Sequence, residues 1–127
     1  MRKYFELAEH ILTSIIEIKR VEVERQWAFD ENDMPAVNIK EIETTNIAAD
    51  ENIVTGDTIF SVFFAHATER DTHRQKVESF LSIRRKLIME IIRFDGDIEC
   101  MDIKSAADGA EYTFLWSVIR FKINDCI

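Results

Sequence analysis

The chain has 127 residues, a length that predicts a single domain spanning residues 1–127. Hydrophobic residues make up 46% of the sequence and charged residues 31%, a composition that excludes an intrinsically disordered protein. The net charge of −8 repels phosphate backbones, so we expect no sequence-specific binding to nucleic acid.

The first part of the chain predicts a helix followed by two strands. Apolar residues recur at helical spacing over residues 3–19, which indicates an amphipathic helix. Residues 20–29 alternate between apolar and polar side chains, as does the segment 36–43. A polar turn at residues 30–34 and Pro35 separate the two segments, so we expect them to form a β-hairpin.

Residues 44–57 show no clean period and carry several carboxylates. We therefore predict a long acidic loop over these residues. Loops of this length inside a compact domain are usually functional or mobile.

The second part of the chain predicts a central strand, a long helix and two further strands. Residues 58–67 are rich in aromatic and β-branched types, which favours a strand. Residues 68–71 resemble a capping box that opens a helix running to about Arg93. Residues 97–104 alternate again and are followed by a turn at 105–109.

The last strand, residues 110–123, has no obvious polar side. Large apolar side chains alternate along it in two sets: Tyr112, Phe114, Trp116 and Val118 on one face, and Leu115, Ile119, Phe121 and Ile123 on the other. The helices of the chain can cover one face, whereas the other needs a second layer or another copy of the protein. This pattern favours a protein that assembles.

The predicted order is therefore α-β-β-β-α-β-β. Strands that come mostly in hairpin-like pairs indicate an α+β fold, with a mainly antiparallel sheet of about five strands packed against two helices. No run approaches the ~20 apolar residues needed to cross a bilayer, so we expect no membrane partner.

No group of residues predicts catalysis, and we expect neither an enzyme nor a bound metal or cofactor. His66 and His73 flank Glu69 and Asp71, but a metal site needs three or four convergent ligands, and the two histidines fall on different elements. The glycines are isolated and no nucleophile motif is present. The basic residues of the second helix are interleaved with carboxylates, which favours an exposed, salt-bridged face.

Five residues are candidates for contacts between subunits. Trp27, Phe63 and Trp116 are large aromatics, which serve either as core or as interface anchors. Arg84 falls close to the apolar stripe of the second helix, where it would pair across an interface. Tyr112 lies near the start of the predicted last strand.

The arrangement of elements resembles the tail terminator, or tail-completion, proteins of tailed bacteriophages, the minor tail protein U-like group. The resemblance rests on a strand ending in aromatic residues, a Pro-led strand, a long helix with paired Ile and Leu residues, and a closing strand after a Gly/Glu/Tyr turn: Trp27, Phe29, Met34–Ile39, Leu87–Ile88, Ile91–Ile92 and Gly109–Tyr112. It implies a homo-oligomeric, typically hexameric ring on the tail tube protein that also meets the head connector protein. DNA would pass through the lumen, and the subunit would be found in the virion, and in the host cytoplasm during assembly.

On this interpretation Asp50, Glu51 and Asp57 would lie in a loop that faces the lumen or a neighbouring subunit. Two other interpretations stay open at this point. One is a different head–tail connector or neck subunit. The other is a small acidic protein-binding module, such as an immunity protein or an antitoxin.

Overall fold

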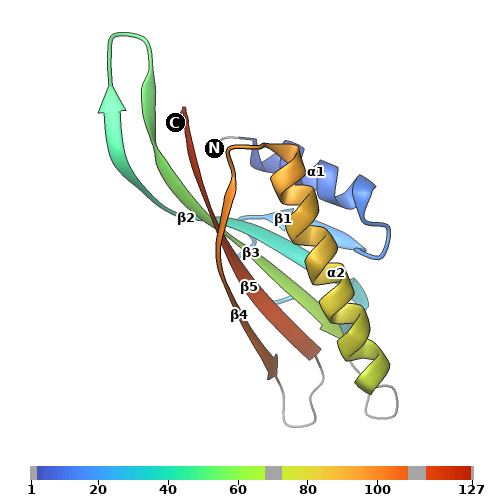
Figure 1. Ribbon diagram of the computed structural model, residues 1–127. Helices are drawn as coiled ribbons and strands as arrows, with labels where there is room; N and C mark the ends of the chain where they lie inside the picture. Colours follow the sequence, from blue (N-terminus) through green and yellow to red (C-terminus); the bar gives the residue numbers. More distant parts are fainter. Residues whose placement is uncertain (1–2, 68–72, 109–113, 127) are drawn as a thin grey trace.

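The computed structural model describes residues 3–67, 73–108 and 114–126. Within these residues the chain forms two layers, a five-stranded sheet and two helices that cover one of its faces (Figure 1). The elements are, in chain order, α1 (Tyr4–Ser14), β1 (Arg20–Val23), a 3-10 turn (Glu31–Asp33), β2 (Ala36–Ala49), β3 (Val54–Ala67), α2 (His73–Phe94), β4 (Glu99–Asp108) and β5 (Phe114–Cys126). The predicted α+β class and element order are confirmed.

Helix α1 is shorter than the predicted helix over residues 3–19. The backbone of Ile15 is already extended, with φ −121° and ψ 93°. Just before it, the hydroxyl of Thr13 donates to carbonyl oxygens of the preceding turn. Such side-chain bonds and a run of β-branched residues both weaken a helix. Ile15 and Ile18 are nevertheless buried, so this segment covers the sheet in an extended form.

The hairpin predicted from residues 20–29 and 36–43 is wrong. Strand β1 ends at Val23 and pairs with β2 in the parallel sense, at one edge of a sheet with the order β1-β2-β3-β5-β4. Glu24 has a φ of 56°, in the left-handed region, which ends the extended run. Residues 24–35 then return the chain to the starting end of β1, as a parallel pair requires.

Residues 44–57 are not the predicted loop. They belong to a long antiparallel hairpin in which β2 and β3 stay paired as far as Ala49 and Val54. Register shifts along β2 interrupt the two-residue alternation, and for this reason the strands were not visible in the pattern. We call residues 41–57 the arm. Figure 1 shows the arm extending beyond both helices.

Strands β4 and β5 both extend further at their C-terminal ends than predicted. Strand β4 continues to Asp108, where a turn over 105–109 was expected. Strand β5 lies between β3 and β4, pairs antiparallel with both, and continues to Cys126. The capping box at 68–71 lies outside the described residues.

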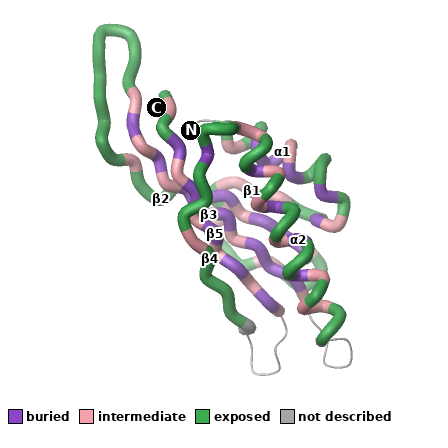
Figure 2. The backbone as a smooth tube through the Cα atoms, viewed as in Figure 1, coloured by how far each residue is buried: buried purple, intermediate pink, exposed green. Residues whose placement is uncertain are grey.

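The core lies between the helices and one face of the sheet. Buried and half-buried residues alternate along β3 and β5 (Figure 2), as expected when one face packs on helices. The largest fully buried side chains come from both layers: Leu7, Ile11, Ile15, Ile39, Phe60, Phe64, Leu87, Ile91, Ile119, Phe121 and Ile123. The prediction that the chain's own helices cover one face of the last strand is confirmed.

Candidate assembly surfaces

The sheet face that points away from the helices, the open face, carries a small aromatic patch. The rings of Phe63 on β3 and Trp116 on β5 stack with centroids 6.1 Å apart. Both side chains are half-buried, as is Val118 beside them. The structure therefore brings two of the predicted interface residues together. Tyr112, a third candidate, lies outside the described residues.

The chain itself supplies part of a second layer over this patch. Met34 is buried against Ala36 and Ala65 on the open face, and Phe29 packs against the same cluster. The segment is fixed to β2 through Asn38, whose side-chain amide exchanges two hydrogen bonds with the backbone of Arg25. The second layer expected from the sequence is thus partly internal.

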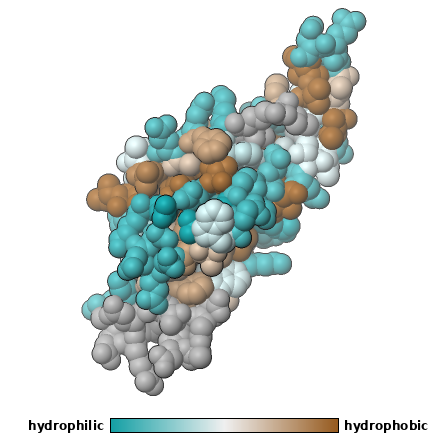
Figure 3. Space-filling view, turned by 180° about the vertical axis from the view of Figure 1, so that it is seen from behind, coloured by the Kyte–Doolittle hydropathy of each residue, from teal (hydrophilic) through white to brown (hydrophobic). Residues whose placement is uncertain are grey.

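Toward the arm the open face becomes charged. The guanidinium of Arg120 donates two hydrogen bonds to the carboxylate of Asp102, and this pairing holds the pKa of Asp102 below its usual range. The ammonium of Lys122 lies 3.9 Å from the carboxylate of Asp57. The apolar patch is therefore confined to the end of the sheet near Trp116. Figure 3 shows this side of the molecule.

Trp27 does not lie on a buried strand face, as the predicted strand over 20–29 implied, but on the surface. Its side chain is 70% exposed. The guanidinium of Arg25 lies 5.2 Å from the Trp27 ring centroid and 4.3 Å from that of Phe29, and it donates to the carbonyl oxygens of Trp27 and Ala28. Trp27 is thus a large aromatic side chain held on an anchored segment, which suits an interface anchor.

Arg84 has an internal role in place of the predicted contact across an interface. Its Nη1 donates to the hydroxyls of Ser105 on β4, at 2.9 Å, and Ser117 on β5, at 3.2 Å. Its guanidinium also lies 5.7 Å from the ring centroid of Phe80. Ser117 is fully buried, so its hydroxyl requires a partner within the fold. Arg84 therefore ties α2 to the sheet.

The three predicted contact residues of the arm have different roles. Asp50 accepts hydrogen bonds from the backbone N–H groups of Asn52 and Ile53, which closes the tip of the hairpin and lowers the Asp50 pKa. Asp57 lies at the base of the arm, where β3 pairs with β5. Glu51 is exposed, and its carboxylate makes no hydrogen bond or ion pair within the described residues.

Asp57 fastens the base of the arm. Its carboxylate accepts 2.8 Å hydrogen bonds from the side-chain amides of Asn46 on β2 and Asn124 on β5, and these bonds lower the Asp57 pKa. Asn46 has a φ of 54°, a left-handed conformation that Asn tolerates better than most residues. The bonds of Asp57 therefore join three strands where the arm leaves the body.

The arm also exposes aliphatic side chains that the sequence pattern did not single out. Ile47 is 63% exposed, and three further residues of the arm are also exposed: Ile42, Ile53 and Val54. Figure 3 shows apolar atoms on this projection. Clustered exposed aliphatics are typical of protein-binding surfaces. Aliphatic residues within an acidic segment could have indicated a binding surface from the sequence. Because a loop was predicted there, their spacing along a strand was not considered.

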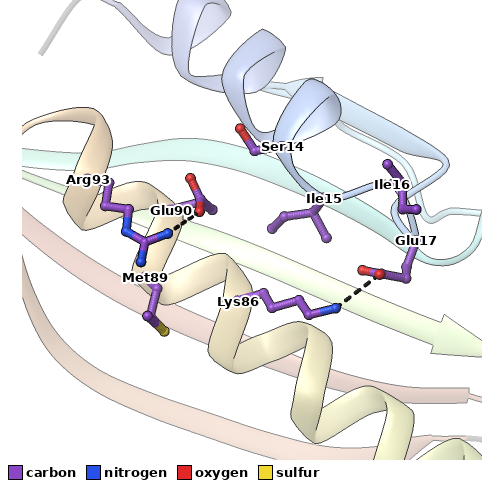
Figure 4. Close-up of a pocket in the computed structure, with 8 residues that line it drawn as sticks. All are labelled: Ser14, Ile15, Ile16, Glu17, Lys86, Met89, Glu90 and Arg93. Atoms are coloured by element: carbon purple, nitrogen blue, oxygen red, sulfur yellow. Dashed lines mark hydrogen bonds and ion pairs between the residues drawn. The ribbon is translucent and has the colours of Figure 1, made fainter.

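A hollow of about 280 Å³ lies between the end of α1 and the C-terminal half of α2. Ile16 and Met89 supply apolar walls (Figure 4). Its charged rim is already paired, because Lys86 bonds Glu17 at 3.0 Å and Arg93 bonds Glu90 at 2.8 Å. The volume is below the range typical of small-molecule sites, so the hollow fits a protein side chain better than a cofactor.

His66 is buried on β3. Its Nε2 lies 3.3 Å from the hydroxyl of Ser79, and its Nδ1 has no hydrogen-bond partner among the described residues. In the part of the chain that the structure describes, no group of three or more His, Cys, Asp or Glu residues is placed to hold a metal ion. Neither helix in that part combines the length and apolar composition that a bilayer crossing requires.

A scan against known protein families finds no match for this chain, and a search of curated proteins finds none either.

Proposed function

We propose that the chain is a tail terminator of a tailed bacteriophage or prophage. In this role copies of the chain form an oligomeric ring, most simply a hexamer, that closes the tail tube and joins it to the head connector. The arm carries the proposal, because it projects aliphatic side chains away from a compact body. An isolated subunit gains nothing from such a projection, whereas a ring subunit uses it to reach a neighbour.

Two further features support assembly. Phe63 and Trp116 form an aromatic patch that the 24–35 segment covers only in part. Trp27 stands exposed on the same segment. The acidic character of the chain suits a lumen through which DNA passes without being held, since carboxylates repel phosphates.

The first experiment is light scattering across protein concentration, with negative-stain images of the same fractions. We expect a particle of about six subunits with a central hole, the closed ring that head-to-tail contacts generate. The purified ring is then offered separately to tail tubes and to head connectors of the same phage. Binding to both supports a terminator, and binding to connectors alone supports a neck subunit.

A shortened-arm variant tests the role of the hairpin. Replacing residues 47–55 with a two-residue Asn-Gly turn removes the exposed tip and keeps the strand pairing below it. We expect the same circular dichroism spectrum as the full chain, with loss of the ring. A chain that stays monomeric even when tail tubes are added would contradict the proposal and favour a binding module.

A further inference from the structure

The face of α2 that is turned away from the sheet carries a second apolar stripe. Leu81, Met89 and Ile92 are between 39% and 46% exposed. With about 3.6 residues per turn, they fall on one side of the helix together with exposed Arg85. The buried residues Phe80, Ile83, Leu87 and Ile91 fall on the opposite side. We call Leu81, Arg85, Met89 and Ile92 the outer stripe of α2.

The outer stripe and the arm carry opposite charges. Residues 41–57 contain five carboxylates and no basic residue. Residues 73–94 contain six Lys or Arg residues and two Glu residues. Arg85 forms no ion pair among the described residues, and Arg74 pairs only with Glu78, at an exposed position. The arm is therefore uniformly acidic. The charge of the outer stripe comes from Arg85, since Arg84 bonds inside the fold and Lys86 and Arg93 are paired with Glu17 and Glu90.

The arm and the outer stripe both expose apolar side chains that could pack against each other. Each exposes aliphatic side chains in the midst of its charges, Ile47 and Ile53 on the arm and Leu81 and Met89 on the stripe. The hollow beside Met89 borders the stripe and offers space for one aliphatic side chain (Figure 4). Within one copy the arm extends away from α2, so the two surfaces cannot meet (Figure 1).

We propose that the arm of one copy of the chain binds the outer stripe of α2 on a second copy. The aliphatic residues of the arm pack on Leu81, Met89 and Ile92, and Glu43 and Glu51 face Arg85 and the basic residues around it. The inference deepens the proposed function, since it names the contact that joins neighbouring subunits in the ring.

Charge complementarity selects a head-to-tail arrangement. A symmetric contact between two arms would bring five carboxylates against five, and a contact between two outer stripes would bring arginines together. When the arm binds the stripe, each copy uses both surfaces once. Contacts of this heterologous type close into rings or continue as filaments.

The experiment uses two full-length variants that each destroy one surface. The arm variant is Glu43→Lys/Glu51→Lys, and the stripe variant is Arg85→Glu/Met89→Glu. Glu31→Lys/Glu99→Lys is the control for the arm variant, since it makes the same change in net charge at exposed carboxylates elsewhere. Circular dichroism confirms that each variant is folded, and sedimentation velocity across concentration measures association.

We expect each surface variant alone to associate about tenfold or more weakly than the wild type, and the control to associate normally. An equimolar mixture of the two surface variants should associate more strongly than either variant alone, because the intact arm of one variant then meets the intact stripe of the other. Combining both sets of charge reversals in a single chain should recover part of the lost association.

Two results would overturn the proposal: surface variants that associate as the wild type does, or a mixture that remains monomeric while the wild type assembles. A wild-type chain that stays monomeric at the highest attainable concentration, with or without tail tubes, would overturn it as well. Rings that tolerate both variants would leave the tail-terminator role intact and reject this contact. Filaments or chains of subunits that depend on the arm would support the contact and reject the ring.

Discussion

Neighbouring residues of α2 have different surroundings and therefore different roles. Arg84 bonds the hydroxyls of Ser105 and Ser117 inside the fold, whereas Arg85 points to solvent. We expect Arg84→Ala to lower the free energy of unfolding by about 1–2 kcal/mol, because the buried hydroxyl loses a charged donor. Arg85→Ala should leave it within about 0.5 kcal/mol of the wild type.

Urea denaturation of the two alanine variants measures this difference. Sedimentation of the same samples gives the complementary result, since Arg85→Ala should weaken association more than Arg84→Ala does. Equal stability of the two variants would show that the Arg84 hydrogen bonds contribute nothing to the fold.

His66 makes stability depend on pH in a defined direction. Burial, and then the charges of Lys76 and Lys19, lowers the His66 pKa below the unfolded value of about 6.5. The unfolded chain therefore takes up the proton more readily than the folded chain. Stability is fully present above the unfolded pKa and is lost as the pH falls below it. The described groups that face the imidazole include the Ser79 hydroxyl but no carboxylate that would offset this effect.

We expect the urea concentration at the unfolding midpoint of the wild type to decrease when the pH is lowered from about 7.5 to about 5.5. His66→Gln, which does not titrate, should show a smaller fall over the same range. Parallel curves for the two proteins would mean that groups other than His66 cause the pH dependence.

At the scale of elements, the sequence predicted well wherever hydrophobic periodicity was regular. Strand β5 was predicted because large apolar side chains occur on both of its faces, with Leu115, Ile119, Phe121 and Ile123 in the buried set. Helix α2 was recognised from its core-facing residues. In both elements the local pattern and the tertiary packing favour the same structure.

The prediction failed where single backbone conformations decide the structure. The left-handed Glu24 ends β1 early, and its side chain accepts a hydrogen bond from the backbone N–H of Glu41, a contact that no local pattern indicates. Along the arm, the left-handed Asn46 lies within one of the two register shifts that erase the alternation. A strand with such interruptions reads as a loop.

The candidate contact residues were predicted from residue type and position along the chain, and neither tells which partner a side chain takes. The structure brings Phe63 and Trp116 together on the open face, and it gives Arg84 hydrogen-bond partners inside the fold. A long cationic side chain near an apolar stripe can reach outward or across to the next element. For Arg84, only the position of its partner Ser117 on β5 shows that the side chain reaches across to the sheet and not outward.

At the scale of the whole molecule, the response to salt separates two kinds of assembly. Each copy carries a net charge of −8, so general repulsion between copies weakens as salt rises and association becomes stronger. If the acidic arm binds the basic outer stripe, the attraction between these two surfaces outweighs the general repulsion between copies. Salt screens this attraction too, and association then becomes weaker. We therefore expect sodium chloride to weaken association of the wild type.

Sedimentation at about 0.05 M and about 0.5 M sodium chloride makes the test, because the screening length falls severalfold over this range. The arm variant Glu43→Lys/Glu51→Lys should lose most of this salt dependence. Stronger association of the wild type at the higher concentration would point to an apolar contact, such as one through Trp27 and the open face.

The outer edge of β2 along the arm is a place where the chain could aggregate. Beyond Ile39, which pairs with the end of β1, no described strand covers this edge, and an uncovered edge invites another chain to add a strand and begin aggregation. The register shifts at Glu41/Glu43 and Thr45/Ala48 break the regular ladder that such growth would copy. The irregularities that made the arm difficult to predict thus also make its outer edge a poor template for adding a further strand.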